Sequence, residues 1–139
     1  MNEKHILAFA ESAEVMAIAA GKSIKEGIQK SLNTEFKSDG SPVTDVDKAT
    51  EDRIREIISE RYSDHGILGE EREDVAPDAE FKWLIDPIDG TIPFITGIPV
   101  FGTLIALVQG DTPIIGVIDM PMTGERWIGR YGLDTLKNG

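Results

Sequence analysis

Two long amphipathic helical patterns come before the strand-like segments of this 139-residue chain, and this order limits the folds open to it. Small and aliphatic side chains recur every three or four residues from Glu3 to about Gln29, and again from Thr44 to about Arg61. This spacing predicts two helices that each bury one face. A polar, glycine- and proline-containing stretch at residues 38–42 separates them.

Short apolar runs separated by turn residues follow the second helix and predict a sheet. The expected strands are Gly66–Gly69, Trp83–Ile85, Phe101–Val108, Pro113–Asp119 and Glu125–Gly129. The last three are joined by short turn-like segments, which favours an antiparallel meander. We therefore predict an α+β fold for residues 1–139, with two long helices packed on a mainly antiparallel sheet, instead of a parallel βαβ alternation.

Composition narrows the class of protein. The 25 acidic residues against 14 basic ones give a formal net charge of −11, which disfavours binding to nucleic acid or an anionic membrane. The chain has no cysteine, so disulfides and thiolate chemistry are excluded. No apolar run reaches the ~20 residues that span a bilayer, and the first residues lack a secretory pattern, so we expect a cytoplasmic protein.

The segment Asp86–Thr91 carries the strongest chemical signal. Its two carboxylates, Asp86 and Asp89, stand three residues apart where an apolar strand meets a helix-start pattern, and Gly90 and Thr91 offer backbone amides. Carboxylates at a strand end can hold a hard cation while nearby amides hold an anion. Taken alone, the motif leaves an ordinary turn equally open, because Asp, Pro and Gly also build turns.

Two further acidic pairs accompany this motif. Glu70 and Glu71 stand sixteen and fifteen residues before Asp86, a separation that a loop could fold back on itself to add a third carboxylate. Asp45 and Asp47 lie just inside the second helix, where Thr44 to Asp47 fits a capping box. For Asp47 alone, capping is favoured over catalysis.

Other candidate sites are weaker. Gly21-Lys22-Ser23 does not form a phosphate-binding loop, since Met16 occupies the place of the first glycine and the stretch lies within a helix. His5 and His65 are isolated in the sequence, so a surface role is favoured for both. The remaining candidate ligands are oxygens. They favour Mg²⁺, Mn²⁺ or Ca²⁺ over zinc, and phosphate chemistry favours Mg²⁺.

Taken together, these motifs resemble the inositol monophosphatase family in order and spacing. The resemblance rests on Ser41–Asp47 with Glu51, on Gly69–Glu71 and on Trp83–Thr91. Gly97–Leu107 and Gly124–Gly129 look most like the branch that includes histidinol-phosphate phosphatases. The resemblance covers essentially the whole chain and implies the N-terminal half of a layered α/β/α/β/α sugar-phosphatase fold.

The resemblance also implies a set of metal ligands. Glu70, Asp86 and the backbone carbonyl of Ile88 would hold one Mg²⁺, and Asp86 and Asp89 would share a second. Glu70, with further waters, would help to hold a third and weaker metal. These metals imply direct attack of water on a small phosphate monoester, without a phosphoenzyme.

The remaining site residues follow from the same resemblance. Asp47 and Thr91 would orient the attacking water, and Asp89 with the amides of Gly90 and Thr91 would bind the substrate. Histidinol phosphate is the expected substrate. An inositol phosphate or another sugar phosphate stays open, as does a catalytically silent fragment that binds metal.

Two features depart from the family pattern. Family members run to roughly twice this length, with a later Trp-Asp-x-Ala-Ala-Gly motif that supplies another metal ligand, and this sequence has no such motif. We therefore expect a single N-terminal metal-binding domain without its C-terminal partner, which associates with itself or with a complementary C-terminal fragment. Ile92-Pro93 also replaces a basic residue and a serine, which weakens the case for histidinol phosphate.

Overall fold

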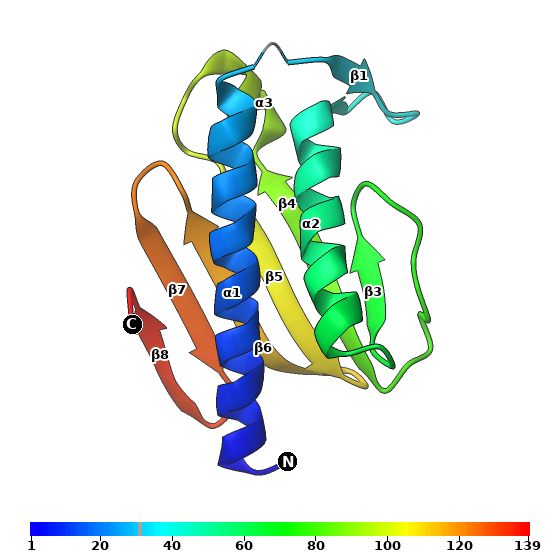
Figure 1. Ribbon diagram of the computed structural model, residues 1–139, viewed down its shortest axis with the longest axis vertical. Helices are drawn as coiled ribbons and strands as arrows, with labels where there is room; N and C mark the ends of the chain where they lie inside the picture. Colours follow the sequence, from blue (N-terminus) through cyan, green and yellow to red (C-terminus); the bar gives the residue numbers. More distant parts are fainter. Residues whose placement is uncertain (31) are drawn as a thin grey trace.

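Two helices cover one face of a six-stranded sheet in the computed structural model, which describes residues 1–30 and 32–139 (Figure 1). The long helices are α1 (Glu3–Ile28) and α2 (Asp45–Arg61). The sheet follows chain order, β3 (Gly66–Gly69), β4 (Phe81–Asp89), β5 (Gly102–Gln109), β6 (Thr112–Met120), β7 (Glu125–Arg130) and β8 (Leu133–Lys137). The predicted α+β fold, with two long helices on a mainly antiparallel sheet, is confirmed.

Several elements differ from the sequence-based expectation. The polar stretch at residues 38–42 forms most of the turn of a small hairpin, β1 (Thr34–Phe36) and β2 (Pro42–Thr44), and its last residue begins β2. Gly40 in this turn has φ +84°. β3 pairs in parallel with β4, and this is the parallel pair in the otherwise antiparallel six-stranded sheet; the sequence had not indicated how β3 pairs. β8 was not predicted, because only Leu133 and Leu136 of its five residues are apolar and most of the strand is exposed. A six-residue helix, α3 (Thr91–Thr96), follows β4 where the sequence showed a helix-start pattern.

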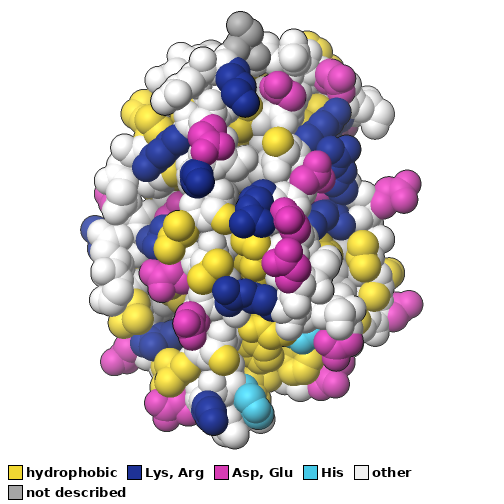
Figure 2. Space-filling view, in the orientation of Figure 1, with side chains coloured by type: hydrophobic (Ala, Val, Ile, Leu, Met, Phe, Trp, Pro, Cys, Tyr) yellow, Lys and Arg dark blue, Asp and Glu magenta, His cyan; other side chains and the backbone are white. Residues whose placement is uncertain are grey.

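The strand register gives the sheet two different faces. Trp83, Leu107 and Ile115 pair across β4, β5 and β6 and are buried on the side of the helices. Small side chains support this packing from α1, where Ala13, Ala17 and Ala20 are 0% exposed, and the larger side chain of Met16 is fully buried among them. The three alanines allow the backbone of α1 to lie close to the sheet. The helix-covered side of the molecule carries interspersed acidic and basic side chains (Figure 2).

The opposite face of the sheet has no covering element within the described residues. Here Asp86, Leu104, Ile118 and Trp127 form one cross-strand row, of which Ile118 is 50% and Trp127 41% exposed. Leu84 lies on the same face, two residues before Asp86 in β4. These residues line a hollow of about 670 Å³ that reaches Glu70 and Asp86. The candidate site therefore borders an open apolar surface.

None of the helices within residues 1–30 and 32–139 is both long enough and apolar enough to cross a membrane.

Candidate active site

The candidate site residues gather where β4 ends, α3 begins and α2 presents its N-terminus. They come from four elements or their connections, and a hollow of about 340 Å³ lies between them. Its lining includes Lys37, Glu70, Glu71, Asp86, Ile88, Gly90 and Thr91. The site is thus assembled from segments that are far apart in the sequence.

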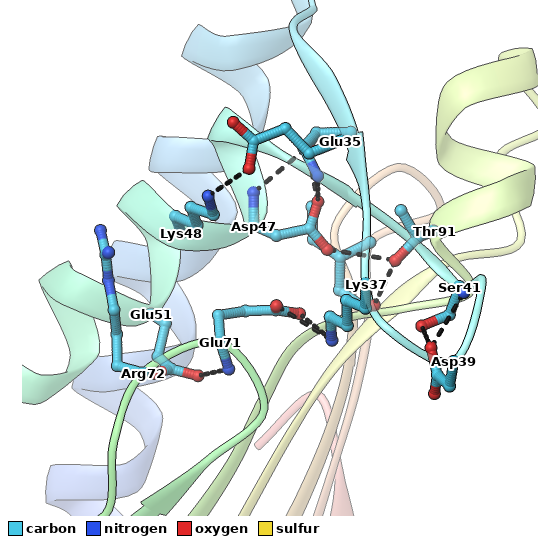
Figure 3. Close-up of polar contacts among 12 residues, drawn as sticks. Glu35, Lys37, Asp39, Ser41, Asp47, Lys48, Glu51, Glu71, Arg72 and Thr91 are labelled. Carbon is cyan, nitrogen blue, oxygen red and sulfur yellow. Dashed lines mark hydrogen bonds and ion pairs between the residues drawn. The ribbon is translucent and has the colours of Figure 1, made fainter.

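Asp47 combines a structural contact with a contact to the site. It is 0% exposed, and its Oδ2 accepts hydrogen bonds from the amide (2.9 Å) and the hydroxyl of Thr44. Its amide in turn donates to Thr44 Oγ1 at 3.2 Å, which confirms the predicted capping box. The second carboxylate oxygen, Oδ1, accepts from the Thr91 hydroxyl at 3.1 Å (Figure 3). Capping therefore leaves one oxygen of Asp47 for the site.

The end of β4 departs from regular strand pairing next to the candidate site residues. The register with β5 shifts between Asp86 and Asp89, so the backbone bulges at Pro87 and Ile88. The buried hydroxyl of Thr103 donates to the Pro87 carbonyl at 2.8 Å and holds the bulge. The Ile88 carbonyl lies 3.3 Å from Thr91 Oγ1. Asp86, the Ile88 carbonyl and Thr91 are thereby fixed around one bend.

Asp86 is the electrostatic centre of the site. Burial, followed by the negative charges of Glu70, Asp89, Glu71 and Asp47, raises the pKa of Asp86 from 3.8 to about 6. These carboxylates are therefore close enough to repel one another. Ionised together, they favour a cation among them, because bound positive charge would relieve the repulsion.

One cation of the protein already lies at the edge of this cluster. Lys37 Nζ contacts Glu71 at 3.0 Å and 3.2 Å from its two oxygens. Burial raises the pKa of Glu71, and the Lys37 ammonium opposes that rise. Lys37 comes from the β1–β2 hairpin, which the sequence did not predict, and no sequence signal connected it with the site.

The donor set fits a hard divalent cation. Glu70, Asp86, Asp89 and the Ile88 carbonyl offer oxygen ligands, the type that Mg²⁺ prefers. Within the described part of the chain, no three acidic or histidine side chains form a ready metal-binding group. The acidic side chains line the hollow instead of meeting at one point.

The surface prediction for His65 is wrong, whereas His5 is exposed as expected. His65 is 9% exposed and its Nδ1 accepts a hydrogen bond from Trp83 Nε1 at 3.1 Å. Its ring stacks on Tyr62 and Phe81, and burial lowers its pKa. Tyr62 follows the end of α2, whereas Phe81 and Trp83 belong to β4. Because these aromatic residues are separate in the sequence, the sequence gave no sign that they cluster around His65. His65 serves the core and not the site.

The structure therefore combines a layered α+β domain with an acidic, oxygen-lined hollow at the end of β4. The chain belongs to the inositol monophosphatase family, whose model matches residues 5–139. The proteins of this family are phosphatases, which hydrolyse phosphate monoesters.

Two relatives and one solved structure illustrate the similarity. The chain is 44% identical over 133 residues to "Bifunctional phosphatase IMPL2, chloroplastic" of Arabidopsis thaliana, covering 94% of this chain and 38% of that protein. It is 39% identical over 111 residues to a histidinol-phosphatase of Chlorobaculum parvum, covering 80% and 43% respectively. The suhB extragenic suppressor protein of Bartonella henselae matches with a TM-score of 0.88 and 29% identity, over 94% of this chain and 52% of that one. The chain thus spans about two fifths to one half of these proteins.

Proposed function

We propose that this chain is the metal-binding, water-activating domain of a Mg²⁺-dependent phosphomonoesterase. The observation that carries the proposal is the Thr91–Asp47 hydrogen bond, 3.1 Å long, beside the carboxylate cluster around Asp86. The cluster supplies ligands for a cation, and the hydrogen-bonded pair supplies a route for a proton. Membership of a phosphatase family supports the reaction class.

The proposed metal ligands form two main Mg²⁺ sites that share Asp86. Glu70, Asp86 and the Ile88 carbonyl would hold one Mg²⁺, with Asp86 and Asp89 holding a second and Glu70 contributing to a weaker third site. Bound Mg²⁺ would neutralise phosphoryl charge, lower the pKa of a water and stabilise the leaving alkoxide. Asp89 is exposed to solvent and is therefore accessible to a substrate.

The protein's own groups orient the nucleophile. Because the Thr91 hydroxyl donates to Asp47 Oδ1, its lone pairs are left to accept a hydrogen bond from water. A proton leaving that water can pass to Thr91 while the Thr91 proton passes to Asp47. The capping hydrogen bonds to Asp47 Oδ2 hold the carboxylate still during this transfer.

The turn before α3 would bind the phosphate. Gly90 has φ +90° and ψ +50°, a left-handed conformation that side chains disfavour, and it turns the chain from β4 into α3. We propose that the amides of Gly90 and Thr91 donate to phosphoryl oxygens, with Asp89 beside them. This places the ester close to the Thr91 hydroxyl.

The variant Thr91→Val tests this assignment. It removes the hydroxyl but keeps the shape of the side chain, so phosphate release is expected to fall about a hundredfold or more, with KM little changed. Thr91→Ser retains the hydroxyl and should lose less than about tenfold. Steady-state phosphate release measures both. Equal activity in Thr91→Val and the wild type would remove Thr91 from the proton route.

Histidinol phosphate is the proposed substrate. The similarity to a histidinol-phosphatase over 80% of the chain supports it. An inositol phosphate or other sugar phosphate is the alternative, favoured by Ile92, which is 63% exposed at the mouth of the hollow where it offers no cation to a substrate. The third possibility is a silent metal-binding fragment, for which Mg²⁺ would raise the melting temperature while no phosphate is released.

We also propose that the open sheet face mediates self-association. Ile118 lies in the middle of the exposed apolar row, so Ile118→Asp is expected to shift the chain toward the monomer in light scattering. Phe36→Asp is the matched control, because Phe36 is 73% exposed on the β1–β2 hairpin, which is not part of the six-stranded sheet. A wild-type chain that stays monomeric at high concentration would contradict self-association and favour a complementary C-terminal fragment as the partner.

The cytoplasmic location stays a prediction.

A further inference from the structure

The turn at residues 69–72, which begins with the last residue of β3, is held from the side by α2. Glu51, one helical turn beyond Asp47, is 0% exposed, and its Oε1 accepts the hydrogen bond of the Glu71 amide at 2.9 Å (Figure 3). The Glu70 amide, one residue earlier, donates to the Ile85 carbonyl at 3.3 Å. The backbone around Glu70 is therefore fixed on one side by the sheet and on the other by a buried carboxylate.

Arg55 completes this attachment. Its Nε donates to Glu51 Oε2 at 2.9 Å, and its terminal nitrogen donates to the Arg72 carbonyl at 3.2 Å. The side chain of Arg55 is only 13% exposed. The pair Glu51–Arg55 thus contacts the turn at two backbone groups, the amide of Glu71 and the carbonyl of Arg72.

Gly69 makes this close contact possible. A Cβ atom built on Gly69 would lie 2.5 Å from Glu51 Oε1 and 2.6 Å from the other carboxylate atoms. No side chain can occupy that space without moving either the carboxylate or the turn. The turn therefore sits directly against Glu51, with Glu70 as the next residue.

We propose that Glu51 and Arg55 are positioning residues that hold the 69–72 turn so that Glu70 faces the cation site. This inference rests on the proposed function, in which Glu70 is a metal ligand. Asp47 and Glu51 are four residues apart and lie on the same face of α2. Helix α2 would then position both Asp47, the proposed proton acceptor, and Glu70, the proposed cation ligand.

A role in stability alone does not account for the arrangement. A buried ion pair contributes little net stability compared with apolar residues of the same volume. The Glu51–Arg55 pair instead forms hydrogen bonds with two specific backbone groups of the turn, the amide of Glu71 and the carbonyl of Arg72. Groups that orient a ligand in this way commonly control metal affinity by about ten- to hundredfold.

The test compares Glu51→Gln with Asp52→Asn. Asp52 neighbours Glu51 on α2 and also contacts the turn, through Arg72 at 2.9 Å, but this ion pair is exposed. Mn²⁺ binding to the full chain, followed by electron paramagnetic resonance, should weaken about tenfold or more in Glu51→Gln. In Asp52→Asn it should change less than about twofold. Arg55→Lys, which keeps the charge but is too short for both contacts, should resemble Glu51→Gln.

A second measurement without metal separates this inference from the proposed function. Hydrogen exchange of the Glu71 amide should quicken in Glu51→Gln and Arg55→Lys and stay unchanged in Asp52→Asn. If both variants keep wild-type Mn²⁺ affinity and wild-type exchange, the positioning role is overturned. If the wild type binds no Mn²⁺, the proposed metal site fails, and the exchange rate of Glu71 alone then supports or overturns the attachment of the turn.

Discussion

Asp86→Asn is expected to be more stable than the wild type in the absence of divalent cations, yet to gain no stability from Mg²⁺. In the wild type, Asp86 is half-buried and faces the negative charges of Glu70, Asp89 and other carboxylates. Asparagine removes that repulsion and also removes the ligand that the two proposed Mg²⁺ ions share. Thermal unfolding with Mg²⁺ and with excess chelator measures both effects, and phosphate release should fall below detection.

The pH dependence of the chelated protein follows from the same residue. The folded pKa of Asp86, about 6, lies above the ordinary value of 3.8, so the folded chain holds this proton more tightly than the unfolded chain does. The resulting stabilisation is fully present below pH 3.8 and is lost as the pH rises through about 6. The free energy of unfolding should therefore fall more in the wild type than in Asp86→Asn over this range.

A matched control for Asp86→Asn is Asp111→Asn. Asp111 is exposed in the turn between β5 and β6, and the same change of charge there should leave the Mg²⁺ response unaltered. An Asp86→Asn protein that Mg²⁺ stabilises as much as the wild type would place the cation elsewhere.

Trp83→Ala is expected to give the largest loss of stability, about 3–5 kcal/mol. Trp83 is 0% exposed between the sheet and the helices, and its indole donates to His65. Alanine would leave a cavity and deprive the buried Nδ1 of His65 of its partner. Urea unfolding followed by circular dichroism gives the free energy of unfolding.

Trp127→Ala is the control for Trp83→Ala, since Trp127 is 41% exposed on the open face of the sheet. Its loss should cost far less stability, measured at a protein concentration where the chain is monomeric. Equal losses of unfolding free energy in the two variants would contradict the packing of the helices on the face of the sheet that carries Trp83.

The main elements could be predicted because local signals agreed with the tertiary structure. The capping box at Thr44 and Asp47 begins α2 as expected, and the apolar alternation of β5 to β7 matches a sheet with one buried face. The β1–β2 hairpin escaped prediction because its strands are three residues long and β1 is exposed. The apolar pattern on which strand prediction depends is absent there.

The candidate site could be predicted only as a set of residues. The spacing of Glu70, Asp86 and Asp89 marked them as acidic groups near strand ends, and family resemblance supplied their roles. Neither signal could reveal that Glu51 binds the Glu71 amide or that Lys37 contacts Glu71. These contacts join segments about 20 and 34 residues apart, so they depend on how α2 and the hairpin pack.

The most direct test of the account is phosphate release by the purified chain from histidinol phosphate and from inositol 1-phosphate, each with Mg²⁺ and with excess chelator. The account predicts release that requires Mg²⁺ and is faster with histidinol phosphate. Release that persists in chelator, or no release from a chain that is folded by circular dichroism, would contradict a Mg²⁺-dependent phosphomonoesterase formed by these residues.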